Sequence, residues 1–373
     1  MDLIPVSRPS FGEEELASVK TVFDSGWLGL GAQVLEFEQE VGKFLGAKNV
    51  VCTNAGTTAL HLALDALGIG KGDEVIVPSF TFVATIQAIT ETGATPVFCD
   101  IHADDLNMDI NDVRKKISPK TKVIMPVHYR GIPCDMDEIQ SLAKKHNLKV
   151  VEDAAHAFGS SYKGKKIGSF GDIACFSFDP IKNISCGEGG AVVFQDDILL
   201  ERVQQKRILG IDRDTWSRYR NERSWFYDVV TQGYRYHMSN ISAAVGLVQL
   251  KKFDKMNRRK IEVATRYDAA FDGVEGITLL RNEGYKEIGL FVYILKINKG
   301  RNELMDYLTR NGVGSGVHYI PSHVFSFYKK EGVHLPITEQ IYDEILTLPL
   351  FPDITDAQVE HVITSVKSGV VAR

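Results

Sequence analysis

The sequence has few of the features that would place a protein in a membrane or on nucleic acid. It contains no run of about 18 apolar residues, so we expect no transmembrane helix. A formal net charge of −5 provides no general electrostatic attraction to nucleic acid or to a membrane surface. The opening stretch, MDLIPVSRPS, lacks the charged-then-apolar pattern of a signal peptide. We therefore expect a cytoplasmic protein that binds neither nucleic acid nor membrane.

Cysteine is scarce and irregularly spaced. The chain contains Cys52, Cys99, Cys134, Cys175 and Cys186. An odd number without CxxC spacing argues for reduced thiols and against a disulfide framework. There is also no HExxH motif, and no third ligand accompanies the histidine pair at 318 and 323, so we expect no metal site.

Helical and strand-like segments alternate through the first half of the chain. The expected buried strands are 49–52, 74–77, 95–99, 122–125 and 148–152. Apolar-periodic helices separate them, which predicts an α/β protein whose mostly parallel sheet is covered on both faces.

The pattern changes after a long helical stretch at 239–267, which we expect to be broken near Phe253. The segments expected beyond it are a strand at 289–297, a helix at 301–311, a strand at 314–318 and helices at 338–346 and 356–368. We place a domain boundary near Leu250, with a large domain at 1–250 and a smaller C-terminal domain at 251–373.

The composition of the stretch 176–192, FSFDPIKNISCGEGGAV, indicates a reactive site rather than a structural scaffold. Lys182 lies between an expected strand at 173–178 and a turn that contains Gly187, Gly189 and Gly190. A lysine near a strand end can present its amine to an aldehyde cofactor and hold it as a Schiff base. Taken alone, the stretch also fits a solvated loop lysine.

A second stretch, LKVVEDAAHA at 148–157, places Asp153 at the carboxyl end of an expected strand. Ligands of open α/β sheets bind outside these strand ends. A carboxylate there can keep the ring nitrogen of pyridoxal phosphate protonated. The order Asp153, Ser177, Lys182, within EDAAHA and FSF…K…GEGG, resembles the DegT family of sugar aminotransferases over essentially the whole chain.

The resemblance implies a fold, a cofactor and a partner. The fold is the three-layer fold type I of pyridoxal-phosphate enzymes, with a seven-stranded, mostly parallel sheet and a smaller C-terminal α+β domain. The cofactor is pyridoxal 5'-phosphate, bound as a Schiff base to Lys182, with pyridoxamine phosphate as its amino-carrying form. Lys182 would act as general base and acid, and Asp153 would keep the cofactor ring cationic. A homodimer with shared active sites is also implied.

The segment TNAGTTAL at 53–60 joins an expected strand to an expected helix. Helix N-termini bind phosphate through free backbone N–H groups. Gly56 permits close approach, Thr57 or Thr58 adds a hydroxyl, and Ser177 can reach the same phosphate. We favour phosphate binding over ordinary capping by Thr or Asn. The GxxxxGK[ST] spacing of a P-loop is absent.

Two further residues are expected beside the cofactor. By resemblance Phe82 stacks on the cofactor ring, a contact worth on the order of 1 kcal/mol, and Phe80 is the alternative. His156, three residues after Asp153, is expected to contact the cofactor as a polar neighbour. His128 lies near the site, although a core histidine is the more common fate of such a residue.

The segment GYRYHM at 233–238 departs from the family patterns G-[FY]-N-Y-R-M and G-Y-K-Y-N-M. In the family an Asn of this loop reaches the phosphate in the partner subunit. Arg235 or His237 can make that contact with a charge-assisted bond, and the sequence leaves both open.

Substrate contacts are expected in two places. SGWLGLG at 25–31 is either a turn that packs Trp27 or, by resemblance, a substrate-binding segment with Trp27 and Gly29 at the mouth of the site. In HYIPSH at 318–323, His318 and His323 either pack or contact the sugar or diphosphate, with His323 the better candidate.

By resemblance the reaction moves an amino group from L-glutamate to a keto-sugar linked to a nucleoside diphosphate. The product would be an amino sugar for a surface polysaccharide such as a lipopolysaccharide O-antigen. RDTW at 213–216 and WFYD at 225–228 resemble the branch that aminates C4, which favours a 4-keto-6-deoxyhexose. Amination at C3 stays open, as does the nucleotide (UDP, dTDP or GDP). A different fold type I enzyme, such as an amino-acid aldolase, and a cofactor-binding regulatory protein are the alternatives.

Overall fold

The computed structural model describes residues 3–212, 227–280, 285 and 287–371. Its α-helices are α1 (Glu13–Ser25), α2 (Ala32–Leu45), α3 (Gly56–Ala66), α4 (Val83–Glu91), α5 (Ile110–Lys116), α6 (Met136–His146), α7 (Asp197–Arg207), α9 (Asn240–Phe271), α10 (Arg301–Arg310), α11 (Pro336–Glu344) and α12 (Asp356–Val371). Its strands are β1 (Asn49–Thr53), β2 (Glu74–Pro78), β3 (Thr95–Cys99), β4 (Thr121–Ile124), β5 (Lys149–Asp153), β6 (Ser161–Tyr162), β7 (Lys165–Lys166), β8 (Ile173–Ser177), β9 (Gly190–Phe194), β10 (Ile277–Leu279), β11 (Tyr293–Ile297) and β12 (Ile345–Leu348).

A seven-stranded sheet forms the centre of the large domain, in the order β1-β9-β8-β5-β4-β2-β3. The pairs from β8 to β3 are parallel. Only β9 runs in the opposite direction, because it is antiparallel to both of its neighbours. The mostly parallel seven-stranded sheet predicted from the sequence is therefore confirmed, and the carboxyl ends of six strands meet at one edge.

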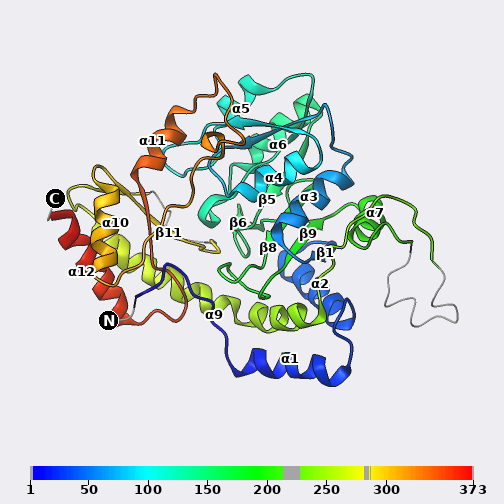
Figure 1. Ribbon diagram of the computed structural model, residues 1–373, viewed down its shortest axis with the longest axis horizontal. Coiled ribbons are helices and arrows are strands. Elements are labelled where there is room, and N and C mark those ends of the chain that lie inside the picture. Colours follow the sequence, from blue (N-terminus) through cyan, green and yellow to red (C-terminus); the bar gives the residue numbers. More distant parts are fainter. Residues whose placement is uncertain (1–2, 213–226, 281–284, 286, 372–373) are drawn as a thin grey trace.

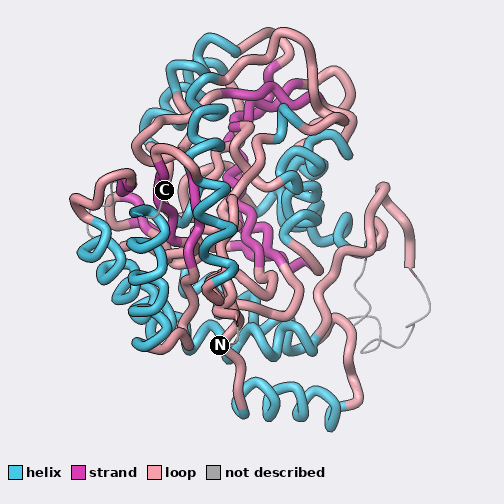
Figure 2. Tube along the Cα trace, turned by 60° about the vertical axis from the view of Figure 1, so that its left-hand side comes forward, coloured by secondary structure: helices cyan, strands magenta, loops and turns pink. Residues whose placement is uncertain are grey.

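Helices cover both faces of this sheet, as Figure 2 shows. Val151 of β5 points into the core beneath α3 and α4, while its neighbour Val150 points into the core beneath α5 and α6. Towards the β1 end, Phe176 of β8 packs against α2 and the first half of α9. Because strands buried on both faces have no polar side, they appear in the sequence as the continuous apolar runs from which they were predicted.

The smaller domain is built on the antiparallel sheet β10-β11-β12. Helices α10 and α12 lie beside it, at the side of Figure 1 where both termini lie. Helix α9 lies above α1 in Figure 1 and joins the two domains: Leu247 belongs to the large-domain core, and Tyr267 belongs to the small-domain core. The boundary that we place near Leu250 falls inside this helix.

The break expected in α9 near Phe253 is wrong, because the helix is continuous from Asn240 to Phe271. Phe253 is 3% exposed and packs edge-on against Phe44 and Phe158, with ring centres 5.3 and 5.7 Å apart. This aromatic contact fixes the middle of the helix on the large domain.

Two elements of the small domain also differ from expectation. Residues 314–318 form no strand but a single bridge between Gly316 and Thr347. The helix expected at 338–346 ends at Glu344, and its last two residues, Ile345 and Leu346, begin strand β12, which pairs with β11. A short apolar run does not distinguish the two structures by periodicity. Within the described part of the chain, no helix is long and apolar enough to span a membrane. All five cysteines are buried thiols.

Candidate functional site

A cavity of about 300 Å³ opens at the edge where the parallel strands end. The described residues that line it come from the loops after β1, β2, β5 and β8 and from the small domain. They are Ala55, Gly56, Thr57, Leu60, Thr81, Phe82, Ala84, Thr85, Asp153, Ala155, His156, Ser177, Asp179, Ile181, Lys182, Glu188, His318 and Tyr319. The fold thus brings eight of the predicted site residues together: Gly56, Thr57, Phe82, Asp153, His156, Ser177, Lys182 and His318.

Lys182 lies in the loop that follows β8, where its backbone N–H donates to the carbonyl of Asp179 at 3.0 Å. Its Nζ lies 4.3 Å from the centre of the Phe291 ring. Burial lowers the pKa of Lys182 to about 8, and the negative charges of Asp153 and Asp179 act in the opposite direction. Near neutral pH this amine is unprotonated far more often than an ordinary lysine, which is the state that acts as nucleophile or base.

Asp153 is the last residue of β5 and is 4% exposed. One carboxylate oxygen accepts a hydrogen bond from the Thr85 hydroxyl at 2.6 Å, and the other accepts from the Ala155 N–H at 3.1 Å. Burial raises the pKa of Asp153, whereas these two hydrogen bonds and the charges of Lys182 and His128 lower it. One hydrogen-bond donor on each oxygen therefore fixes the orientation of the carboxylate, and both bonds favour its ionised form.

The N-terminus of α3 is arranged to receive an anion. Its N-cap residue is Ala55, and no side chain caps it, so the expected alternative of ordinary capping by Thr or Asn is not found. A Cβ at Gly56 would lie only 2.7 Å from Ser177 Cβ, so glycine permits the helix end to approach Ser177. Thr57 lines the cavity. The Thr58 hydroxyl instead donates to the backbone carbonyl of Ala55 at 2.9 Å.

The two candidate aromatic residues are clearly separated. Phe82 is 52% exposed and lines the cavity. Phe80 is 1% exposed and packs in the core against Tyr129, with ring centres 5.1 Å apart. Phe82 is therefore the ring available to a ligand.

His156 lies between two aromatic rings. It stacks on Phe291, with ring centres 4.2 Å apart, and its Nε2 is 3.0 Å from the Tyr319 hydroxyl. Burial and the positive charge of Lys182 hold the pKa of His156 well below its usual range. Its Nδ1 is buried and has no hydrogen-bond partner among the residues that the structure describes, which leaves a polar atom for a ligand to satisfy.

His318 enters the cavity from the small domain. Its Nδ1 is 2.9 Å from the Thr347 hydroxyl, and its backbone carbonyl accepts a hydrogen bond from the Tyr129 hydroxyl. Burial lowers the pKa of His318 to about 4, and the positive charge of Lys182 acts in the same direction. This imidazole is therefore neutral at physiological pH.

Several predicted residues lie away from this cavity. Trp27 donates its indole N–H to the Leu30 carbonyl at 2.8 Å, and Gly29 is exposed in the same segment. Arg235 is exposed and His237 is half-buried, and neither lines the cavity of its own chain. The resembling stretches at 213–216 and 225–226 lie outside the described residues.

The remaining histidines have structural partners. His323 Nδ1 is 2.7 Å from the Ser79 hydroxyl, and its Nε2 is 3.3 Å from Glu339, so it packs beside the site without lining the cavity. His128 is fully buried, with Nε2 2.9 Å from Glu152, which is the arrangement of a core histidine. In the described residues no group of three His, Cys, Asp or Glu could hold a metal ion.

Sequence reasoning assigned no role to five polar residues that line the cavity: Thr81, Thr85, Asp179, Glu188 and Tyr319. Thr81 and Thr85 lie four positions apart where a strand end leads into α4, and that spacing was the available signal. Glu188 and Tyr319 stand inside GEGG and HYIPSH, motifs that were recognised without assigning these side chains.

The chain is similar to known proteins in sequence and in fold. The sequence model of the DegT/DnrJ/EryC1/StrS aminotransferase family matches residues 9–367. The spore coat polysaccharide biosynthesis protein SpsC of Bacillus subtilis is 40% identical, over 98% of this chain and 96% of its own.

Two solved structures show the same fold. The putative sugar aminotransferase Spr1654 of Streptococcus pneumoniae, in its PMP form, has a TM-score of 0.93 and 33% identity over 99% of both chains. It has also been solved in apo and PLP forms. PseC of Helicobacter pylori, an aminotransferase involved in the biosynthesis of pseudoaminic acid, has a TM-score of 0.94 and 29% identity over 100% of both chains. The fold type I architecture predicted from the sequence is confirmed.

Proposed function

The chain belongs to the DegT/DnrJ/EryC1/StrS aminotransferase family, and we propose that it transfers an amino group from L-glutamate to a keto-sugar linked to a nucleoside diphosphate. The observation that carries this proposal is the placement of Lys182, with its lowered pKa, and the anchored carboxylate of Asp153 in one cavity. The sugar aminotransferases among the solved relatives support the substrate class. The relative SpsC supports a role in polysaccharide biosynthesis.

The residues of the cavity fit pyridoxal phosphate. The uncapped start of α3, with Gly56, Thr57 and Ser177, would hold the phosphate. Phe82 offers an exposed ring for stacking, and the unsatisfied Nδ1 of His156 offers a hydrogen-bonding atom. Asp153 would hold the ring nitrogen, and Lys182 would hold the aldehyde carbon. When bound, the cofactor supplies an electron sink for the carbon from which a proton is removed.

The protein's own residues then supply the proton transfers. Lys182 would take a proton from the α-carbon of the donor and return it to the carbon on the other side of the donor nitrogen, which its lowered pKa makes possible near neutral pH. Asp153 keeps a negative charge in place, because the Thr85 hydroxyl and the Ala155 N–H hold the carboxylate. His318 stays neutral, so it can take part in hydrogen bonds to a substrate without adding charge.

We propose that the amino group is added at C4 of a 6-deoxyhexose. Addition at C3 is the alternative. The test is an absorbance spectrum of the cofactor-loaded protein before and after L-glutamate, followed by a panel of UDP-, dTDP- and GDP-linked 3-keto and 4-keto sugars. Loss of the visible absorbance with glutamate, reversed by one keto-sugar, is the expected result. An unchanged spectrum would refute glutamate as donor. A spectrum that changes with glutamate but with no keto-sugar would favour another fold type I enzyme.

We further propose that the working form is a homodimer in which the 234–237 segment completes the partner's site. Arg235 and His237 do not reach the cavity of their own chain, and the nearby Val229 and Val230 are 59% and 52% exposed. Mixing Lys182→Ala protein with Arg235→Ala/His237→Ala protein tests this, because each mixed dimer then holds one intact site. Activity that returns on mixing supports a shared site; no activity, with subunit exchange verified by mass spectrometry, refutes it.

A further inference from the structure

Lys260 is a buried amine that the chemistry above does not use. It lies on α9 and is 5% exposed. Among the described residues its Nζ has one hydrogen-bond partner, the side-chain oxygen of Asn183 at 2.9 Å. No described Asp or Glu lines the small cavity that it shares with Lys182. Because burying an amine is unfavourable without such a partner, the bond to Asn183 is what makes this position tolerable.

Asn183 directly follows Lys182 and joins its own loop to two others. Its side-chain N–H groups lie 3.3, 3.0 and 2.9 Å from the carbonyls of His156, Phe158 and Gly289. Rotation of this amide by half a turn would set its oxygen against these three oxygens. Lys260 selects the observed orientation of the amide. Its amine donates to the Asn183 side-chain oxygen, so the Asn183 side-chain nitrogen faces the loop carbonyls.

The joined loops carry groups that surround the Lys182 amine. Phe291, two residues after Gly289, has its ring centre 4.3 Å from Lys182 Nζ and 4.2 Å from the centre of the His156 ring. One turn before Lys260, the side chain of Asn257 binds the same loop through the backbone carbonyl of residue 288 at 2.8 Å and the backbone N–H of residue 290 at 3.0 Å. Two successive turns of α9 therefore hold the loop that brings Phe291 to the lysine.

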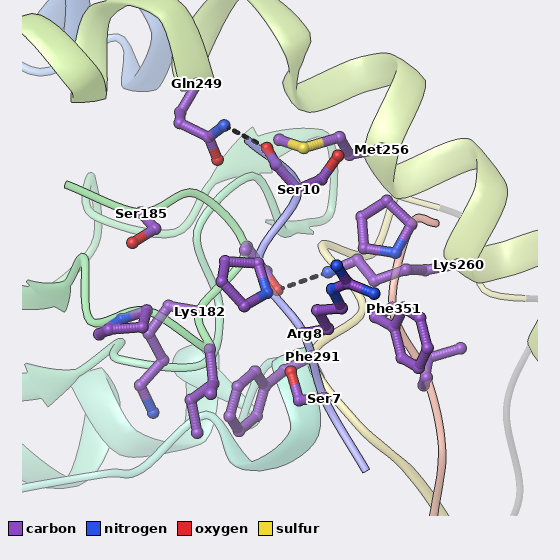
Figure 3. Close-up of a pocket in the computed structure, with 16 residues that line it drawn as sticks. Ser7, Arg8, Ser10, Lys182, Ser185, Gln249, Met256, Lys260, Phe291 and Phe351 are labelled. Atoms are coloured by element: carbon purple, nitrogen blue, oxygen red, sulfur yellow. Dashed lines mark hydrogen bonds between the residues drawn. The ribbon is translucent and has the colours of Figure 1, made fainter. Parts of the chain in front are cut away.

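Figure 3 shows Lys182 and Lys260 on opposite sides of the small cavity, with the Lys182 amine pointing away from Lys260. Direct contact between the two amines is therefore not the link. We propose that Lys260 is a positioning residue for Lys182: through Asn183 it holds together the loops that pack Phe291 and His156 beside the catalytic amine. This inference rests on the proposed function only for the role of Lys182 as the reacting amine.

The proposal predicts the direction of a measurable change. Burial is the main cause that lowers the pKa of Lys182 to about 8. If the loops separate and water reaches the side of the amine that the Phe291 ring covers, that pKa rises towards its usual range. The effect does not depend on the charge of Lys260, whose own pKa is lowered to about 7 by burial, because a neutral amine also donates to Asn183.

The experiment uses full-length protein freed of cofactor, so that its readout does not depend on turnover. The protein is acetylated briefly at pH values from about 6.5 to 9.5, and labelling of the Lys182 peptide is measured by mass spectrometry. In Lys260→Met we expect the midpoint of Lys182 labelling to rise by about one pH unit. At pH 8 the unprotonated fraction then falls from about a half to about a tenth, so labelling slows about fivefold.

Two further variants make the test specific. Asn183→Ser breaks the network from its other end and carries the test if Lys260→Met does not fold. The double variant Lys260→Met/Asn183→Ser should shift the midpoint no further than either single change, because both changes break the same Lys260–Asn183 hydrogen bond. Lys252→Met is the matched control on α9: it loses ion pairs to Glu14 and Glu15 at 2.6 and 2.9 Å and contacts no group of the site.

A midpoint that is unchanged in folded Lys260→Met, or that moves equally in Lys252→Met, would overturn the inference, as would additive shifts in the double variant. Failure of the proposed function is a separate result: unmodified, cofactor-loaded protein would then show no spectral response to any amino donor. The half-reaction rate with L-glutamate, measured in the same variants, should fall with the labelling rate if both statements hold.

Discussion

The hydrogen bond from Thr85 to Asp153 provides the sharpest test of the site, because valine has nearly the shape of threonine and lacks only the donor. Thr85 is 1% exposed, and its hydroxyl lies 2.6 Å from one carboxylate oxygen of Asp153. In Thr85→Val that oxygen loses its side-chain donor while the Ala155 N–H on the other oxygen remains. The carboxylate keeps its place but loses part of what stabilises its charge.

The size of the effect follows from the kind of bond. A hydrogen bond to a charged acceptor contributes about 1.5–3 kcal/mol, which corresponds to about a 10- to 100-fold change in an equilibrium or a rate. Burial already raises the pKa of Asp153, and the Thr85 bond lowers it, so removing the bond raises it further. The ionised carboxylate is the form the proposed chemistry needs. Activity should therefore be lost at a higher pH in Thr85→Val than in the unmodified enzyme.

The assay is the rate of the glutamate half-reaction from about pH 5.5 to 9, with the melting temperature as a check on folding. We expect a defect of about tenfold or more on the acid side that shrinks as the pH rises. Thr90→Val, on the same helix, is the matched control, since among the described residues its hydroxyl bonds only the Gln87 carbonyl, at 3.2 Å. A Thr85→Val enzyme with an unshifted pH profile would refute the role given to this bond, and so would a uniform loss at all pH values.

Three other changes test separate parts of the site. Lys182→Ala should bind the cofactor and melt normally while losing turnover by several orders of magnitude, and normal turnover would remove Lys182 from its role. Gly56→Ala should weaken phosphate binding about tenfold or more, because its Cβ would lie 2.7 Å from Ser177 Cβ, and an unchanged cofactor Kd would contradict the cradle. The pKa of His318 is about 4 in the folded protein, against 6.5 for an ordinary histidine. Between pH 4 and 6.5 the unfolded chain therefore binds more protons than the folded protein. Stability to urea should therefore fall as the pH drops from 6.5 to 4, and less steeply in His318→Asn.

The sheet and the centre of the site could be predicted because local sequence determines both. Buried parallel strands are short apolar runs, and the residues that follow them must meet at one edge of the sheet. Asp153 and Lys182 each stand just after such a run, so their proximity follows from topology alone. Gly56 could be placed for the same reason, since it begins a helix after a strand end.

The parts that could not be predicted depend on contacts between distant segments. Nothing in the sequence near Phe82 and Phe80 shows that one ring faces the cavity and the other packs against Tyr129 from a different loop. Thr85 could not be assigned to Asp153, 68 positions away, without the packing of α4 on the sheet. The continuity of α9 was also missed, although the residues around Phe253 include no Gly or Pro and favour a helix; rings from two other segments hold Phe253 in place within it.

The pKa values of the site residues also depend on burial to which both domains contribute. Large-domain loops supply Lys182 and Asp153, while the small domain supplies His318 and the Phe291 ring. Burial lowers the pKa of Lys182 and of His318 and raises that of Asp153, so in each case burial favours the neutral form. Hydrogen bonds oppose this only at Asp153, through donors held by the large domain itself. The charge of Asp153 is thus fixed locally, whereas the free amine of Lys182 depends on the small domain remaining closed over it. A change that loosens the contact between domains should therefore impair Lys182 first and leave Asp153 ionised.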